Sequence, residues 1–441
     1  MSGTGDPPPG PLPSDATGLL APGKAGHRTP PRAGGPPSLT ALEIALLGFA
    51  ASASVSAAAA RVLLAVFIAA WIVARRAPAQ RPRLLWAALG IASIFAGEIL
   101  ACLVNRVPAH LLDPFREHWV LLGFGPLAMV AAANPALYRR AVGLAAGMGA
   151  VVGIYAVWQH FTGVDVVRGR GLESNGEVFV VTGTFDHHLT YGGAVMLLLL
   201  AAATLVASSE RWQRVRGGIG LTLGLALPLG LALLWSYARS AWGGAFAGLV
   251  VLVAARRRRR LVAFGGLAVA ALVLILVVDP TVRMRIRAAF GWREPPPRLL
   301  LWMASGRMLR AHPLGIGPGR FEELLETYKV PGRTISTGHG LSDYWRAALD
   351  GGPLGLLGYL GLVAGSMAAA AAGLRRRRQV DDGATSGDWI ERAARRDLRS
   401  VALAASAAML MAGMFQTYFW DREVVLLWIL LAAPAALEPD G

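Results

Sequence analysis

Residues 241–278 read AWGGAFAGLVVLVAARRRRRLVAFGGLAVAALVLILVV, in which two apolar runs flank the five consecutive arginines 256–260. Each run approaches the roughly 20 residues that an α-helix needs to cross the hydrocarbon core of a bilayer. Short basic loops between such helices stay on the cytoplasmic side of the membrane. This stretch therefore predicts two transmembrane helices that are joined on the cytoplasmic face.

The same pattern extends over most of the chain. The sequence has 441 residues, of which 54% are hydrophobic and only 16% are charged, whereas about 25% of the residues of a typical soluble domain are charged. Long apolar runs of this kind predict an all-α fold, a polytopic transmembrane helical bundle of about twelve spans. The predicted spans are approximately 40–57, 59–74, 84–104, 119–134, 141–159, 189–207, 217–235, 241–255, 261–278, 353–374, 400–418 and 423–437.

Basic residues predict the orientation of the spans. With the N-terminus in the cytoplasm, the basic runs 256–260 and 375–378 both lie inside, whereas the opposite orientation puts both outside. If residues 41–74 formed a single span, the N-terminal tail would move outside and the later loops would keep their sides. The net charge of +16 is thus explained by membrane topology and not by a nucleic-acid-binding surface.

Four regions follow from this topology. Residues 1–38 are rich in proline and glycine, which predicts a disordered cytoplasmic tail. Residues 39–278 hold the first nine spans, residues 279–352 form a long periplasmic loop, and residues 353–441 hold the last three spans and a basic cytoplasmic loop at 375–399. The rule that basic loops stay in the cytoplasm applies to short loops, so the long basic loop 279–352 can lie in the periplasm. Because functional residues concentrate on loops that a rigid scaffold holds, we expect catalysis in the periplasmic loop.

Glu98 and Cys102 both fall inside the predicted span 84–104. Cys102 is the only cysteine, so no intrachain disulfide is possible. Glu98 is costly at membrane depth and is therefore either a neutral structural acid or the partner of an arginine in a cavity.

The periplasmic loop contains three notable segments. Residues 298–311 have apolar positions at helical spacing with arginines among them, which predicts an amphipathic helix on the outer bilayer surface. Residues 312–321 follow, with a proline and alternating glycines that predict a tight turn. His339 and Asp343 then lie four residues apart and share one face if this segment is helical.

Four segments around this loop carry a family resemblance. They are Arg239 with Ser240 and Ala241 at a span boundary, Arg298 with Trp302 four residues on, the run from His312 to Phe321, and His339 upstream of residues 352–356. A weaker match is the run 183–188 at the start of a span. In this order, around one long outer loop, these segments resemble the O-antigen ligase and O-antigen polymerase superfamily.

The resemblance implies a fold similar to that of membrane glycosyltransferases that use lipid-phosphate donors. It implies a protein of the bacterial inner membrane that transfers a glycan from undecaprenyl pyrophosphate to an acceptor hydroxyl at the periplasmic face, in lipopolysaccharide and cell-envelope polysaccharide synthesis. In a ligase the acceptor is lipid A-core or another surface acceptor, and in a polymerase it is the next lipid-linked repeat. We favour a ligase because the order of the segments is closer to the wider ligase group. The implied partners are the donor, the acceptor and membrane lipids, with no nucleic acid.

The resemblance also implies roles for four arginines. Arg239 and Arg298 are the expected catalytic arginines, which hold the pyrophosphate of the donor. A guanidinium group suits this role because its planar donors bind phosphate oxygens in pairs and it stays charged. Arg307 and Arg320 are expected to contribute to binding of the anionic lipid carrier.

His339 is the expected general base, since a histidine has an ordinary pKa of about 6.5 and can accept the proton of the acceptor hydroxyl. Asp343 is expected to orient the His339 imidazole and to take part in substrate binding. Direct displacement of the pyrophosphate inverts the anomeric centre and needs no metal and no cofactor. The adjacent residues Asp186, His187 and His188 do not predict a metal site, because neighbouring residues rarely converge on one ion.

Two other classes of protein are considered beside the transferase. A transporter or a flippase of lipid-linked glycans would have two similar halves and ionisable groups near the membrane midplane, whereas here the halves differ and the charge accumulates in one loop. A purely structural membrane subunit would not need Arg239 at a short outer turn.

Overall fold

A computed structural model gives the structure of the chain. It describes residues 40–74, 82–175, 178–208, 217–256, 297–332, 342–377 and 389–438. Of the sequence predictions, the tail 1–38, the span 261–278 and the catalytic role of His339 fall on residues outside these ranges.

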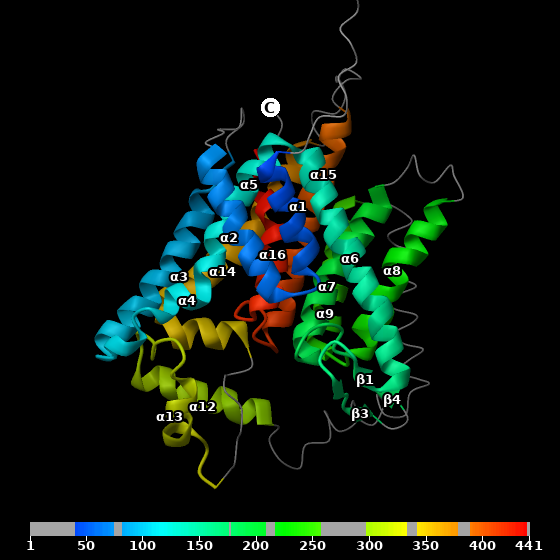
Figure 1. The fold of residues 1–441 in the computed structure, drawn as a ribbon. Coiled ribbons are helices and arrows are strands. Elements are labelled where there is room, and N and C mark those ends of the chain that lie inside the picture. The colour runs from blue at the N-terminus through cyan, green and yellow to red at the C-terminus, as the bar shows by residue number, and fades with distance from the viewer. Residues whose placement is uncertain are drawn as a thin grey trace, which may run out of the picture. The chain divides into compact units, whose positions relative to one another are not determined.

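Most of the described residues are helical (Figure 1). The α-helices are α1 (Ala41–Ala53), α2 (Ala57–Ala74), α3 (Leu85–Val104), α4 (Asp113–His118), α5 (Phe124–Ala133), α6 (Pro135–Thr162), α7 (His188–Ser208), α8 (Gly217–Trp235), α9 (Arg239–Arg256), α12 (Pro297–Ala311), α13 (Phe321–Tyr328), α14 (Asp343–Arg377), α15 (Trp389–Gly413) and α16 (Arg422–Ala432). Short 3-10 helices are η1 (Pro108–His110), η2 (Trp119–Gly123) and η5 (Ala433–Ala436).

Five of the described helices are long and apolar enough to cross a membrane, namely α2, α3, α6, α7 and α14. Helix α1 and the part of α8 at Gly224–Trp235 are shorter apolar helices. These elements confirm a helical membrane protein. The count of twelve spans stays a prediction.

Helix α6 shows how the sequence sets the bounds of a span. The side chain of Asn134 accepts a hydrogen bond from the backbone N–H of Leu137 (2.9 Å), and Pro135 occupies the first helical position. Both features favour a helix start. At the other end Gly163 adopts a left-handed conformation (φ +69°), which ends the helix.

Two short hairpins of antiparallel strands lie between α6 and α7, and the prediction of an all-α fold did not include them. Strands β1 (Val164–Asp165) and β2 (Arg170–Gly171) pair with Val164 opposite Gly171. Strands β3 (Ser174–Asn175) and β4 (Val178–Phe179) pair with Ser174 opposite Phe179. Strands of two residues are too short to show the alternating pattern by which a strand is predicted.

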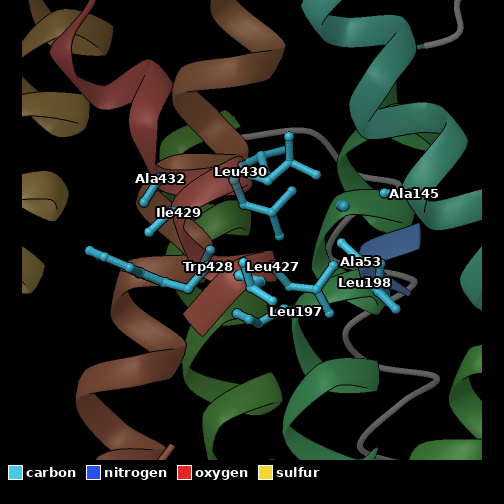
Figure 2. Close-up of a cluster of buried hydrophobic side chains, with 14 of the residues drawn as sticks. Ala53, Ala145, Leu197, Leu198, Leu427, Trp428, Ile429, Leu430 and Ala432 are labelled. Carbon is cyan, nitrogen blue, oxygen red and sulfur yellow. The ribbon is translucent and has the colours of Figure 1, made fainter. Parts of the chain in front are cut away.

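Helix α16 lies at the centre of the hydrophobic core. Every residue from Val424 to Ala432 is buried. Figure 2 shows its side chains Leu427 and Leu430 among residues of α1, α6 and α7, including Ala53 and Leu198. Since lipid is as apolar as leucine, close packing of this kind is what holds membrane helices together.

The end of α15 differs from the predicted span 400–418. The helix ends at Gly413, and residues 414–421 form a connection to α16, which we call the 414–421 loop. Tertiary hydrogen bonds stop the helix, because Ser342 donates to the carbonyl of Gly413 (3.1 Å) and the N–H of Phe419 donates to Asp343 (2.8 Å).

Helix α14 also begins earlier than the predicted span 353–374. It starts at Asp343 and passes through Gly352, whose backbone is not helical (φ 61°, ψ −153°). Glycine tolerates this conformation, and it produces a kink in front of Pro353. The helical residues ahead of the kink belong to the predicted periplasmic loop.

Candidate functional site

A tight turn between α8 and α9 presents Arg239. Ser236 and Ala238 in this turn are fully buried, and Ser236 accepts a hydrogen bond from the N–H of Ala238 (3.3 Å). Tyr237 has a left-handed backbone (φ 53°), which is costly for a bulky residue and persists only where its surroundings impose it. Arg239 itself is exposed at the first position of α9.

The position of Arg239 is electrostatically unfavourable for a cation. The N-terminus of an α-helix carries a partial positive charge, so a positive side chain there is repelled and an anion is attracted. The start of α9 therefore combines a guanidinium group with a helix end that favours the same anionic ligand.

Helix α7 and the 414–421 loop hold this turn in place. A Cβ atom at Gly192 would collide with Ala238, and one at Gly193 would lie 2.6 Å from the ring of Tyr418. The hydroxyl group of Tyr418 is 3.0 Å from that of Ser240. These close approaches fix the start of α9 against two other elements.

Arg298 reaches the same region from the start of α12. Its guanidinium carbon lies 5.9 Å from the ring centroid of Phe415 in the 414–421 loop. The ring of Trp302, one turn further along α12, stacks with that of Phe415 at a centroid distance of 6.4 Å. The contacts join the predicted motif of Arg298 and Trp302 to a loop that is far away in the sequence.

The charges of Arg239 and Arg298 act on one another. Burial lowers the pKa of Arg298, and the nearby charge of Arg239 lowers it further, while Tyr418 has the opposite effect. Within the described part of the chain, neither arginine forms a salt bridge with a carboxylate. Among the described residues these two coupled like charges have no carboxylate counterion, an arrangement whose cost falls when an anion binds.

Arg307 and Arg320 lie within the α12–α13 segment. Arg307 donates a hydrogen bond to the carbonyl of Lys329 (3.1 Å). Arg320 donates to the carbonyl of Ile316 (3.1 Å) and forms an ion pair with Glu323 (3.3 Å). No described contact joins either residue to Arg239 or Arg298, and the part of Arg307 and Arg320 in substrate binding stays a prediction.

Asp343 anchors the 414–421 loop. Its carboxylate is fully buried and accepts hydrogen bonds from the N–H of Phe419 (2.8 Å) and from the hydroxyl of Tyr359 (3.4 Å). Because His339 lies outside the described residues, the orientation of its imidazole by Asp343 stays a prediction, as does its role as general base.

The predicted turn after α12 is tied to the end of α3. The ring nitrogens of His312 lie 2.9 Å from the side-chain oxygen of Asn105 and 3.2 Å from the hydroxyl of Tyr328. Asn105 in turn donates to the carbonyl of Gly315 (2.9 Å). Hydrogen bonds through this turn therefore link the end of α3 to α12 and α13.

A buried polar network lies on the other side of the 414–421 loop. Glu98 is paired with His118 (2.8 Å) and not with an arginine. Arg346 bonds to Glu117 (3.0 Å) and to Asp350 (3.1 Å). Both His118 and Arg346 contact the ring of Trp420, each at 5.8 Å.

The weaker match at 183–188 forms the entry to α7. Thr184 donates to the carbonyl of Val55 (2.7 Å), and Asp186 forms an ion pair with Arg168 (2.6 Å). Burial lowers the pKa of His187, so this imidazole is neutral at pH 7.

Sequence reasoning missed Phe415, Gln416 and Tyr418, because it continued a span through them to residue 418. A signal was present in the sequence: the polar pair Gln416 and Thr417 interrupts an otherwise apolar run. Membrane helices rarely contain such pairs unless they face a partner or a cavity.

The O-antigen ligase family matches residues 221–360 of the chain. The matched residues include Arg239, Arg298 and His339, which are the predicted catalytic residues, and the match confirms the resemblance found in the sequence. A search of the curated proteins finds no match. This part of the chain is similar to the O-antigen ligase family, a similarity that supports a role in glycan transfer for surface polysaccharides.

Proposed function

We propose that the protein transfers a glycan from undecaprenyl pyrophosphate to an acceptor hydroxyl at the periplasmic face of the bacterial inner membrane, as an O-antigen ligase does. The observation that carries this proposal is that the charges of Arg239 and Arg298 are coupled while neither arginine has a carboxylate partner among the described residues. Such a pair needs an anion, and the pyrophosphate of the donor supplies one.

The two arginines stabilise the leaving group. As the bond between the anomeric carbon and the phosphate oxygen breaks, negative charge grows on the pyrophosphate. Donors that are already in position at that charge stabilise the transition state without further reorganisation. The α9 N-terminus adds its partial charge beside Arg239. The family match over residues 221–360 supports the assignment of this chemistry.

The remaining step is a proton transfer. The acceptor oxygen forms a bond to the anomeric carbon on the side opposite the leaving pyrophosphate, which inverts that centre. The hydroxyl proton passes to His339, which acts as general base. We assign lipid A-core or another surface glycan as the acceptor, because the order of the motifs matches the wider ligase group.

The glycan profile of a deletion strain tests this function. If the protein is a ligase, its deletion should cause long glycan chains to accumulate on the lipid carrier and should leave the surface acceptor without glycan. Single repeats on the carrier would instead identify a polymerase, and repeats trapped on the cytoplasmic leaflet would identify a flippase. Either of these profiles contradicts the proposal.

Complementation of the deletion strain tests the roles of Arg239 and Arg298. Plasmid-borne wild-type protein should restore the surface glycan in the deletion strain, whereas R239A and R298A should not. The variant R310A is the matched control, because Arg310 is exposed on the same helix as Arg298 and has no assigned role. Restoration by R239A and by R298A would remove the catalytic assignment.

A further inference from the structure

Trp302 and Phe415 form an aromatic pair beside Arg298. Their rings stack at 28° with a centroid distance of 6.4 Å, and the Arg298 guanidinium lies 5.9 Å from the Phe415 centroid. Both side chains are half-buried, while the next four residues of the 414–421 loop are buried. Part of the aromatic pair is thus accessible to a ligand next to the arginines.

Three polar side-chain atoms, on Trp302, on Arg298 one turn before it and on Gln416 next to Phe415 in the chain, lack hydrogen-bond partners in the described part of the chain. They are the donors Nε of Arg298 and Nε1 of Trp302, and the acceptor Oε1 of Gln416. All three atoms are shielded, and Gln416 as a whole is only 9% exposed. Buried polar atoms in native proteins are normally hydrogen-bonded, and a buried Trp N–H usually has a partner. The set therefore indicates a ligand that both donates and accepts.

We propose that Trp302, Phe415 and Gln416 form a subsite for the sugar of the donor that is joined directly to the pyrophosphate. This inference rests on the proposed function. A pyranose ring carries C–H groups on its faces, and these pack against the negative face of an aromatic ring. Its hydroxyl groups both donate and accept hydrogen bonds, so they match two unpartnered donors and one unpartnered acceptor.

The location favours the donor sugar over a sugar of the acceptor. Arg298 contacts Phe415, and its charge is coupled to that of Arg239. A pyrophosphate on the two arginines therefore has its attached sugar next to the aromatic pair. The pair then orients the anomeric carbon for displacement.

Binding to two forms of the carrier tests this subsite. The full-length protein is purified in detergent, and dissociation constants are measured for undecaprenyl pyrophosphate without sugar and for the glycan-bearing carrier isolated from the deletion strain. We expect W302A and F415L to weaken binding of the glycan-bearing carrier by about tenfold and to leave binding of the sugar-free carrier within about twofold. W302F should retain most of the affinity, because it keeps an aromatic face.

Controls separate the subsite from the proposed function. R298A should weaken binding of both carriers, because it removes a group that holds the pyrophosphate, and W158A should change neither, since Trp158 stacks on Tyr155 in α6 and has no assigned role. Thermal unfolding of each variant shows whether it is folded. If W302A is not folded, F415L provides the test of the aromatic pair. An unchanged affinity of R298A for the sugar-free carrier would overturn the proposed function.

Three results would overturn the subsite itself. They are equal losses for both carriers in W302A and F415L, no loss for either carrier, and a loss confined to the binding of free acceptor glycan.

Discussion

Helix α9 carries an arginine at each end, and the two have opposite environments. Arg256, at the C-terminal end, is buried and bonds to Asp397 (2.6 Å) and to Ser400 (3.1 Å). Arg239, at the N-terminal end, is exposed, is coupled to the charge of a second arginine and has no described carboxylate partner. The helix dipole stabilises the first position and opposes the second.

The difference separates stability from function. A buried cation with a carboxylate and hydroxyl groups around it ties helices together. A cation at the wrong end of a helix, held there by a strained turn, lowers stability and is retained where a ligand needs it. The comparison can be tested by removing the carboxylate partner at the Arg256 end and the arginines at the Arg239 end.

The largest expected effect is at the Arg256 end. Asp397 also pairs with Arg139 (2.7 Å), so D397A leaves Arg256 as a buried charge without its carboxylate. Loss of one partner of a buried pair costs about 3–5 kcal/mol. We expect a lower thermal midpoint in detergent and less protein in the membrane. The control D186A breaks an exposed pair with Arg168 and should cost no more than about 1 kcal/mol. Equal midpoints for D397A and wild type would contradict this assignment.

The Arg239 end should respond in the opposite way. R239A and R298A each remove a group that stabilises the leaving pyrophosphate, and we expect the rate of glycan transfer to fall by about 100- to 1000-fold. Because each change also removes a repulsion between like charges, the thermal midpoint should not fall. The measurement is transfer in reconstituted vesicles beside a melting curve. A parallel loss of both activity and stability would show that the two ends of α9 do not differ.

A smaller effect is expected where the charge is kept. R298K retains the positive charge and loses the planar pair of donors, so we expect a rate about tenfold below that of wild type. A rate equal to that of wild type would show that charge alone is sufficient and that paired hydrogen bonds to the pyrophosphate do not form.

The smallest effect concerns the contact that fixes the start of α9. Y418F and S240A each remove the hydrogen bond between these side chains, which contributes about 1 kcal/mol. The double variant should be no less stable than either single variant, since both remove the same bond. Fully additive losses would show that the two hydroxyl groups act independently.

Much of the helical fold could be predicted from the sequence because each span carries its own signal. The apolar runs of α3, α6 and α7 agree with the described helices to within a few residues at most ends. Arg239 also stands out in the sequence, because basic residues in short loops are expected on the cytoplasmic side and this turn is predicted to lie outside.

The rest depends on contacts between distant parts of the chain. The end of α15 at Gly413 is determined by Asp343 and Ser342, about 70 residues earlier, and no local pattern contains this information. The partner of Glu98 is His118, which lies on another element. The aromatic pair similarly joins Trp302 of α12 to Phe415 of the 414–421 loop. The sequence therefore predicted the motif of Arg298 and Trp302 but not the Phe415 ring beside it.

The central helix α16 is short, and its length leaves room for irregular backbone in front of it. Its eleven residues extend for about 16 Å, roughly half of the 30 Å of a hydrocarbon core. Irregular backbone beside a bilayer is tolerated where protein surrounds it. The bonds from the N–H of Phe419 to Asp343 and from Ser342 to the carbonyl of Gly413 supply such surroundings for the 414–421 loop. The loop that places Phe415 beside Arg298 is therefore fixed by contacts with the start of α14.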